Sequence, residues 1–91
     1  MNKVKKNLKK ISYRSIEEKE IKLNYHLFRS KTKSNGRYIY SVCISSRSDS
    51  NEVNFVYDIT RTRSRADEIF KLLHTGVVTP CTLNDILEDI L

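Results

Sequence analysis

The chain contains 91 residues, of which 38% are hydrophobic and 31% are charged, and its 17 Lys and Arg against 11 Asp and Glu give a formal net charge of +6. A chain of this length forms one domain with a small core. Its two cysteines are too few for a disulfide framework, and no apolar run approaches the ~20 residues that a membrane helix needs. We therefore expect a cytoplasmic protein with reduced thiols and no membrane contact.

Charge is distributed unevenly along the chain. Residues 1–48 carry 13 Lys and Arg against 3 Asp and Glu, whereas residues 49–91 carry 4 against 8. The first part is therefore strongly basic and the second part is acidic. Such asymmetry is typical of a chain that has an interaction tail or a nucleic-acid contact.

The start of the chain predicts a flexible basic arm over residues 1–16, followed by a single domain over residues 17–91. Residues 1–10 contain five lysines and no acid. The arm could bind polyanions by counterion release, or it could be a solubilising tail. Residues 11–16 also fit a short edge strand or a first turn. The candidate nucleic-acid residues in the arm are Lys3, Lys5, Lys6, Lys9, Lys10 and Arg14.

Alternation of hydrophobic and polar residues predicts three β-strands. The first strand covers residues 21–27 with a period of two. Asn35-Gly36 then favours a type I′ hairpin turn, which leads into a second strand over residues 37–46. A polar turn separates this strand from a third, whose hydrophobic residues share one face: Val53, Phe55, Tyr57 and Ile59.

Helical spacing of hydrophobic residues predicts two helices after the strands. Ser64 to Asp67 fits an N-terminal capping box, and Gly76 fits the residue that follows a helix. The apolar stripe of this first helix consists of Ala66, Ile69, Phe70 and Leu73. The predicted fold class is therefore α+β, a three-stranded antiparallel meander with two C-terminal helices packed on one face.

The second helix is short, amphipathic and acidic on its outer side. At ~9 residues it is too short to be stable alone in water, so it must dock on its own sheet or on another protein. The exposed edge of the sheet is a further candidate contact for a partner. The candidate protein-interaction residues in the helix are Ile86, Leu87, Glu88 and Ile90.

The most distinctive stretch is the run from Val78 to Asp89, VTPCTLNDILED. It resembles the closing signature V-T-P-x-T-L-x-D-(I/V)-x-E-D of a small uncharacterised family of clostridia and related Firmicutes. Residues 56–60 and the helix that follows are similar to the same family, so the resemblance spans residues 20–91. Cys81 stands where the family pattern favours a small or β-branched residue. The resemblance implies a shape and no activity.

Three arginines alternate between the last strand and the first helix: Arg61, Arg63 and Arg65. In an extended segment they would point the same way and could grip phosphates. The alternative is a solvated junction in which they pair with nearby acids, Asp58, Asp67 or Glu68. Three strands followed by a helix, with arginines between them, also resemble the sheet-reading DNA-binding domains of phage-type integrases.

No residue pattern predicts catalysis. His26 and His74 are far from any recognisable nucleophile motif, and with Cys43 and Cys81 they lack the paired spacing of a zinc site. We therefore expect a non-enzymatic protein with no metal, cofactor or small-molecule substrate.

Two functions remain open from the sequence. The first is a small regulatory or adaptor protein that binds another protein. The second is a DNA-binding accessory protein, of transcription-regulator or excisionase type, that uses the basic arm and the arginine cluster. Most aromatic rings of the sheet are expected to pack against the helices, and Phe28 is the best candidate for a ring on the uncovered face.

Overall fold

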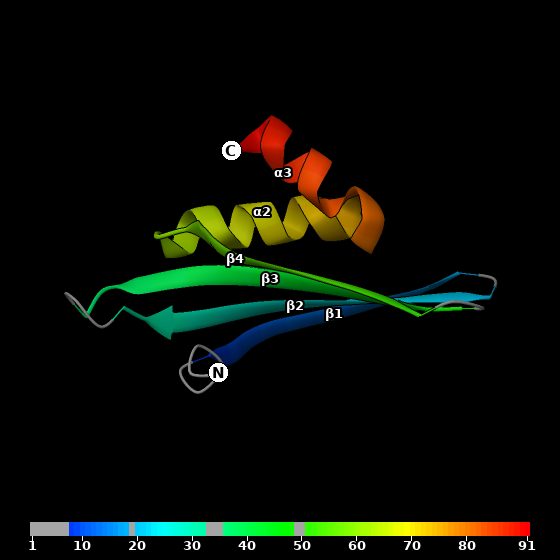
Figure 1. Cartoon of the computed structure of the whole chain (residues 1–91), viewed down its shortest axis with the longest axis horizontal. Coiled ribbons are helices and arrows are strands. Elements are labelled where there is room, and N and C mark those ends of the chain that lie inside the picture. The colour runs from blue at the N-terminus through cyan, green and yellow to red at the C-terminus, as the bar shows by residue number, and fades with distance from the viewer. Residues whose placement is uncertain (1–7, 19, 33–35, 49–50) are drawn as a thin grey trace.

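The computed structural model describes residues 8–18, 20–32, 36–48 and 51–91. An antiparallel sheet has the helices on one side, which confirms the α+β class (Figure 1). The elements are β1 (Lys9–Glu18), β2 (Ile21–Lys31), β3 (Tyr38–Arg47), β4 (Glu52–Thr60), helix α2 (Arg63–Thr75), the 3-10 helix η1 (Pro80–Thr82) and helix α3 (Leu83–Ile90).

The sheet has four strands in the order β1-β2-β3-β4, so the prediction of three strands was wrong. The additional strand is β1, which pairs with β2 and places Ser12, Arg14 and Ile16 opposite Leu27, Tyr25 and Leu23. Two of these three inward-facing residues are polar, so β1 lacks the alternation that reveals a half-buried strand. Its position is set by backbone pairing with a neighbouring strand.

This strand changes the predicted division between arm and domain. The boundary after residue 16 falls inside β1, and three basic residues that were assigned to the arm are in a strand: Lys9, Lys10 and Arg14. Lys3, Lys5 and Lys6 lie outside the described residues. The basic start of the chain is thus partly built into the sheet edge.

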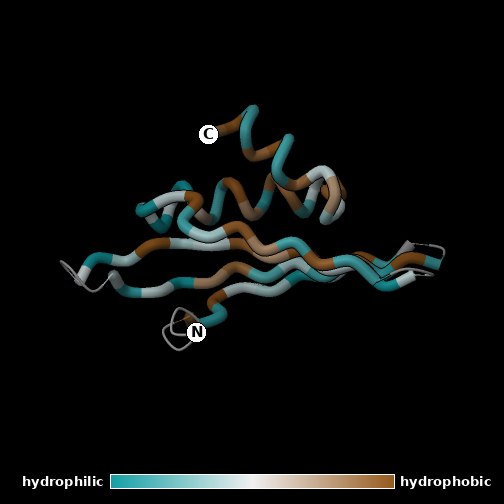
Figure 2. The backbone as a smooth tube through the Cα atoms, in the orientation of Figure 1, coloured by the Kyte–Doolittle hydropathy of each residue, from teal (hydrophilic) through white to brown (hydrophobic). Residues whose placement is uncertain are grey.

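The core lies between the sheet and the helices. Its fully buried side chains include Leu27 of β2, Ile44 of β3 and Ile69 of α2. Tyr25 is also buried, and its hydroxyl donates a hydrogen bond to the Val78 carbonyl at 2.9 Å. Burial raises the pKa of Tyr25 to about 12. Hydrophobic and hydrophilic segments alternate along the strands, as expected for a sheet with one covered face (Figure 2).

An irregularity in β4 divides the hydrophobic residues of this strand between the two faces of the sheet. Phe55 pairs with Cys43 and Val56 pairs with Val42, so Val56 faces the helices and Phe55 faces away. Register shifts further along, where Asp58 has a φ of 58° and its N–H donates to the Ser41 hydroxyl at 3.0 Å. Aspartate tolerates this left-handed conformation better than most residues.

The β4 irregularity overturns the expectation that Val53, Phe55, Tyr57 and Ile59 share one face. Ile59 is buried in the core, whereas the other three side chains are exposed. Period-two alternation predicts side-chain direction only while the strand is regular. Between the pairs Val42–Val56 and Tyr40–Thr60, β4 contains two residues more than regular pairing with β3 would need, and Asp58 lies among them.

The C-terminal segment docks on its own domain. Leu83 and Leu87 are buried, and Ile86 and Ile90 pack against the core. Asn54 of β4 donates from its amide to the Pro80 carbonyl at 3.0 Å and to the Asn84 side-chain oxygen at 2.6 Å. The apolar stripe of α3 is therefore used inside the molecule.

Candidate functional site

Both helices lie on one side of the sheet, and no other described element covers its opposite face (Figure 1). The strand register places several aromatic side chains on that opposite face. Pairing places Tyr13, His26, Cys43 and Phe55 side by side across the four strands. We define the open-face cluster as Tyr13, His26, Phe28, Phe55 and Tyr57. Successive ring centroids lie 5.0, 6.0, 5.9 and 6.4 Å apart in that order.

Several rings of the open-face cluster are accessible to a partner. Tyr13 is 47% exposed, Tyr57 44% and Phe55 40%. Beside them lies Val53, which at 69% is the most exposed large hydrophobic side chain in the described part of the chain. Contiguous exposed apolar patches are often interaction surfaces in proteins, which makes this face the candidate site.

A shallow hollow lies within the open face. It has a volume of about 440 Å³ and is lined by Leu8, Phe28, Cys43, Val53 and Phe55. Phe28 was the residue that the sequence favoured for the uncovered face, and the structure places it there. Such an apolar recess can receive one side chain of a partner, as interface anchors require.

The centre of the open face is uncharged at neutral pH. Burial, and to a lesser extent the charge of Lys10, lower the pKa of His26 below its usual value of 6.5. The Nδ1 atom of His26 is buried and has no hydrogen-bond partner among the described residues. Burial also raises the pKa of the Cys43 thiol, so this thiol stays protonated and is not an activated nucleophile.

Charged side chains surround this centre. The strand register places Lys10, Lys22, Arg47 and Glu17 on the same face as the aromatic rings, and all four are exposed. The ammonium of Lys10 lies 5.3 Å from the centre of the Tyr13 ring. An apolar centre with a charged rim is the usual anatomy of a protein–protein interface.

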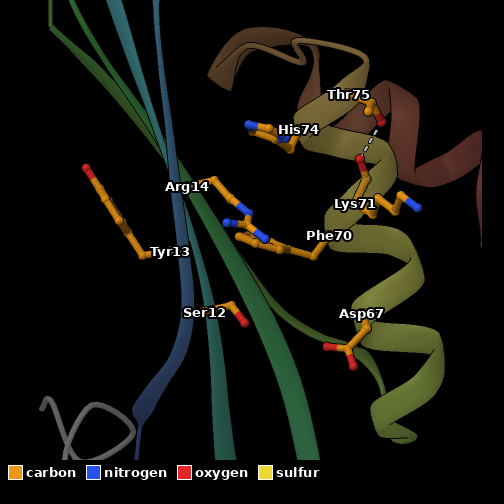
Figure 3. A pocket seen from close by; sticks show the side chains of 8 residues that line it. All are labelled: Ser12, Tyr13, Arg14, Asp67, Phe70, Lys71, His74 and Thr75. Atoms are coloured by element: carbon orange, nitrogen blue, oxygen red, sulfur yellow. Dashed lines mark hydrogen bonds between the residues drawn. The ribbon is translucent and has the colours of Figure 1, made fainter.

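A second, more polar groove separates β1 from α2 (Figure 3). Its volume is about 720 Å³, and its lining includes Arg14 and Ser12 of β1 and Lys71, His74 and Asp67 of α2. Ser12 and Arg14 point toward the helix, whereas Tyr13 projects to the other side of the strand (Figure 3). No sequence pattern predicted this groove, because the groove forms only when β1 joins the sheet.

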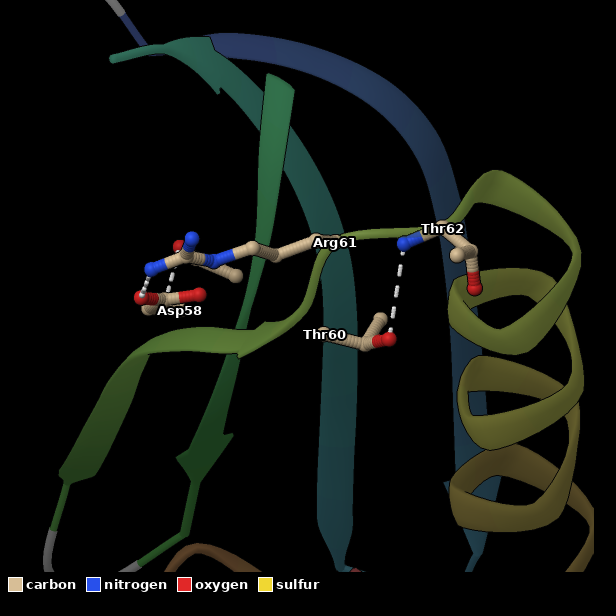
Figure 4. A network of polar contacts seen from close by, with 5 residues as sticks. Asp58, Thr60, Arg61 and Thr62 are labelled. Atoms are coloured by element: carbon tan, nitrogen blue, oxygen red, sulfur yellow. Dashed lines mark hydrogen bonds and ion pairs between the residues drawn. The ribbon is translucent and has the colours of Figure 1, made fainter. Parts of the chain in front are cut away.

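The three arginines do not form an extended row, which was one of the two interpretations that the sequence left open. The helix begins at Arg63, so Arg63 and Arg65 are on a helical turn rather than in an extended segment. Each arginine contacts an acid: Arg61 with Asp58 at 3.5 Å, Arg63 with Asp67 at 3.2 Å, and Arg65 with Glu68 at 2.9 Å. Figure 4 shows Arg61 extended along β4 toward Asp58. The alternative of a junction paired with acids is thus the one observed.

The other candidate residues also have structural partners. Arg65 donates to the Ile90 carbonyl, which joins the start of α2 to the end of α3. Among the tail residues, Leu87 is buried and Glu88 is exposed.

The ring of His74 lies edge-on to Tyr25, with centroids 5.6 Å apart. Within the described ranges, no cluster of three or more His, Cys, Asp or Glu side chains could hold a metal ion.

The fold is that of a small α+β domain with an antiparallel sheet and helices on one side of it. The chain belongs to a family of unknown function, DUF6514, whose model matches residues 4–91. The match begins earlier than the resemblance over residues 20–91 and includes the whole of β1. Searches of curated proteins and of solved structures gave no significant match. None of the helices formed by the described residues is long and apolar enough to span a bilayer.

Proposed function

We propose that this protein is a small, non-enzymatic, cytoplasmic regulatory or adaptor protein that binds another protein through the open face of its sheet. The observation that carries the proposal is the open-face cluster, whose aromatic rings extend across the strands on the side of the sheet away from α2 and α3. The rings contribute large contact area with few rotatable bonds, which makes aromatic residues effective interface anchors.

The arrangement favours a folded or extended protein partner over duplex DNA. The rim includes three cations, Lys10, Lys22 and Arg47, but the centre is apolar and wide. Contacts with duplex DNA are mostly to phosphates and require accessible cations. Arg61, Arg63 and Arg65 are each paired with an acid, so DNA binding by the arginine cluster has less support.

The family resemblance has a physical interpretation that accompanies this proposal. We infer that a closing V-T-P-x-T-L pattern in clostridial and related relatives maintains the docking of α3. The Val78 carbonyl accepts from Tyr25, and the Pro80 carbonyl accepts from Asn54. Thr79 and Thr82 form a reciprocal capping box around η1. These roles are structural, which leaves the open face as the surface for function.

Site-specific photo-crosslinking in the producing cells tests the proposed function. A photoreactive phenylalanine analogue replaces Tyr57 on the open face, and in a matched control it replaces Leu72, which is equally exposed on α2. The expected result is a discrete protein adduct from position 57 that is absent from position 72. Phe55→Ser should abolish this adduct, because it removes a neighbouring ring.

A DNA-binding assay completes the test. The purified protein is titrated with duplex DNA at low salt, and the titration is repeated with added salt and with Arg61, Arg63 and Arg65 changed to Ala. Weak or no binding is expected. Tight, salt-dependent binding that the triple variant loses would contradict the proposal and favour the DNA-binding accessory protein.

A further inference from the structure

The two edge strands of the sheet differ in their protection against pairing. An edge strand presents unpaired backbone N–H and C=O groups, and soluble proteins usually block such edges with lysines or bulges. β1 is blocked in both ways, because it carries Lys9, Lys10 and Arg14 and has an irregularity between Lys10 and Ser12. This edge rejects an additional strand.

β4 lacks this protection along most of its length. Between Glu52 and Asp58 it contains no charged residue and no proline, and its pairing with β3 is regular from Glu52 to Val56. Its helix-facing Asn54 is engaged with Pro80 and Asn84, so the segment is held in place from within the domain. The edge is therefore ordered, regular and uncharged, as recognition by strand addition requires.

The surroundings of β4 provide contacts for the side chains of an added strand. On one side lie the exposed Val53 and Phe55 of the open face. On the other side, a groove of about 330 Å³ is lined by Glu52, Val53, Asn54, Pro80 and Cys81. Because alternate side chains of a strand point to opposite faces, an added strand would use both surfaces.

The charges at the two ends of this segment determine which strand fits. Antiparallel pairing of β4 with a second copy, centred on Phe55, would place Glu52 of each chain opposite Asp58 of the other. Like charges directly opposite each other destabilise strand pairing. Asp58 has partial compensation from Arg61 at 3.5 Å, but both groups are solvent-exposed and the pair is weak. No ion pair of Glu52 is found within the described residues.

We propose that the β4 edge binds an extended segment of a partner protein as a fifth strand, with apolar side chains at alternate positions and Lys or Arg at its two ends. Such a strand places its cations beside Glu52 and Asp58 and its apolar side chains beside Val53 and Phe55. The inference deepens the proposed function and rests on it, because it identifies the kind of segment that the open face and its edge recognise.

A model peptide provides the test. The probe alternates valine and threonine, has a lysine at each end, and matches Glu52–Asp58 in length. Titration of the isotope-labelled protein, followed by backbone amide shifts and intermolecular NOEs, should place the peptide next to β4 and η1. NOEs to β1 instead, or no binding at millimolar peptide, would overturn the proposal.

A charge exchange sharpens the result. Glu52→Lys should lower the affinity for the lysine-ended peptide by about threefold or more and raise the affinity for a glutamate-ended peptide by a similar factor. The reason is that the charge beside one end of the peptide changes sign. Glu20→Lys is the matched control, since Glu20 is an exposed acid in the turn between β1 and β2, on the other side of the sheet from β4. Equal affinity of both peptides for the wild-type protein, or an equal response of the two variants, would also overturn the proposal.

The test separates this inference from the proposed function. If position 57 crosslinks to a partner whose contacts leave the β4 amides unchanged, the open face is a binding surface and strand addition is wrong. If the lysine-ended peptide pairs with β4 but no protein adduct forms in cells, the edge has the proposed chemistry and the proposed function is wrong.

Discussion

The two faces of the sheet are made from the same strands but differ in their exposure to solvent. On the covered face, Leu27, Val42 and Ile44 are almost completely excluded from water by α2 and α3. On the open face, Tyr13, Phe55 and Tyr57 remain partly exposed although they are equally suited to burial. A chain this small gains from every buried side chain, and the exposed aromatic face is therefore the observation on which we base the proposed binding surface.

The largest expected effect contrasts a substitution on each face. Leu27→Ala should lower the free energy of unfolding by ~2–5 kcal/mol, because it leaves a cavity in the core. Val53→Ala should change it by less than ~1 kcal/mol, because Val53 is already largely exposed. Urea denaturation of both variants measures the difference. Equal losses would mean that the two faces contribute alike to stability.

Phe55→Ala tests the same contrast in binding. Removal of the ring should weaken binding of the crosslinked partner by ~2 kcal/mol or more, or about 30-fold, because anchors near an interface centre dominate affinity. Calorimetric titration provides the measurement, with Leu72→Ala as the control on the outer surface of α2. A variant that unfolds more easily but binds normally would show that Phe55 is structural.

Tyr25→Phe sharpens the comparison on the covered side. Loss of the hydroxyl leaves the Val78 carbonyl without this hydrogen bond, and stability should fall by ~1–3 kcal/mol at neutral pH. The pKa of Tyr25 is raised from 10.0 to about 12, so the folded state holds the proton more tightly than the unfolded state. Stability of the wild-type protein should therefore decrease as pH rises through this window.

The corresponding slope should be shallower in Tyr25→Phe. Denaturation curves at a series of alkaline pH values check this expectation. Identical slopes in the two proteins would contradict the raised pKa of Tyr25.

The smallest effect concerns His26 on the open face. Because its pKa is lowered in the folded protein, the unfolded state binds the proton more readily, and stability should fall as pH drops below 6.5. His26→Gln should reduce this loss of stability at acidic pH. Unfolding free energies measured between neutral and mildly acidic pH test the difference. An unchanged slope would exclude His26 as its source.

Particular residues explain which features were predictable. Alternation around Tyr25 and Val42 was strong enough to predict β2 and β3, and Gly76 correctly marked the end of α2. Residues 11–16 were left open between a short edge strand and a first turn, and β1 was not counted in the predicted sheet, because Ser12 and Arg14 face inward. The sequence left the three arginines open between a row and a junction paired with acids. The row does not form because α2 begins at Arg63, and Arg61 pairs with Asp58 of β4.

The candidate surface was only partly predictable. Phe28 was expected on the uncovered face, but Phe55 and Tyr57 were assigned to a single face together with Ile59. The irregularity at Asp58 separates them, and no local pattern marks it in advance. Tyr13 joins the cluster because β1 pairs with β2, a contact between segments that have no shared periodicity.

Local hydrophobic periodicity was thus sufficient to establish an α+β chain with a strand-rich first part and an amphipathic helical end. Tertiary contacts determined the number of strands, the division of β4 between two faces and the docking of α3 on its own core. The reason is physical: periodicity reports how neighbouring residues share a face, whereas strand pairing and helix docking depend on segments that meet only when the chain folds.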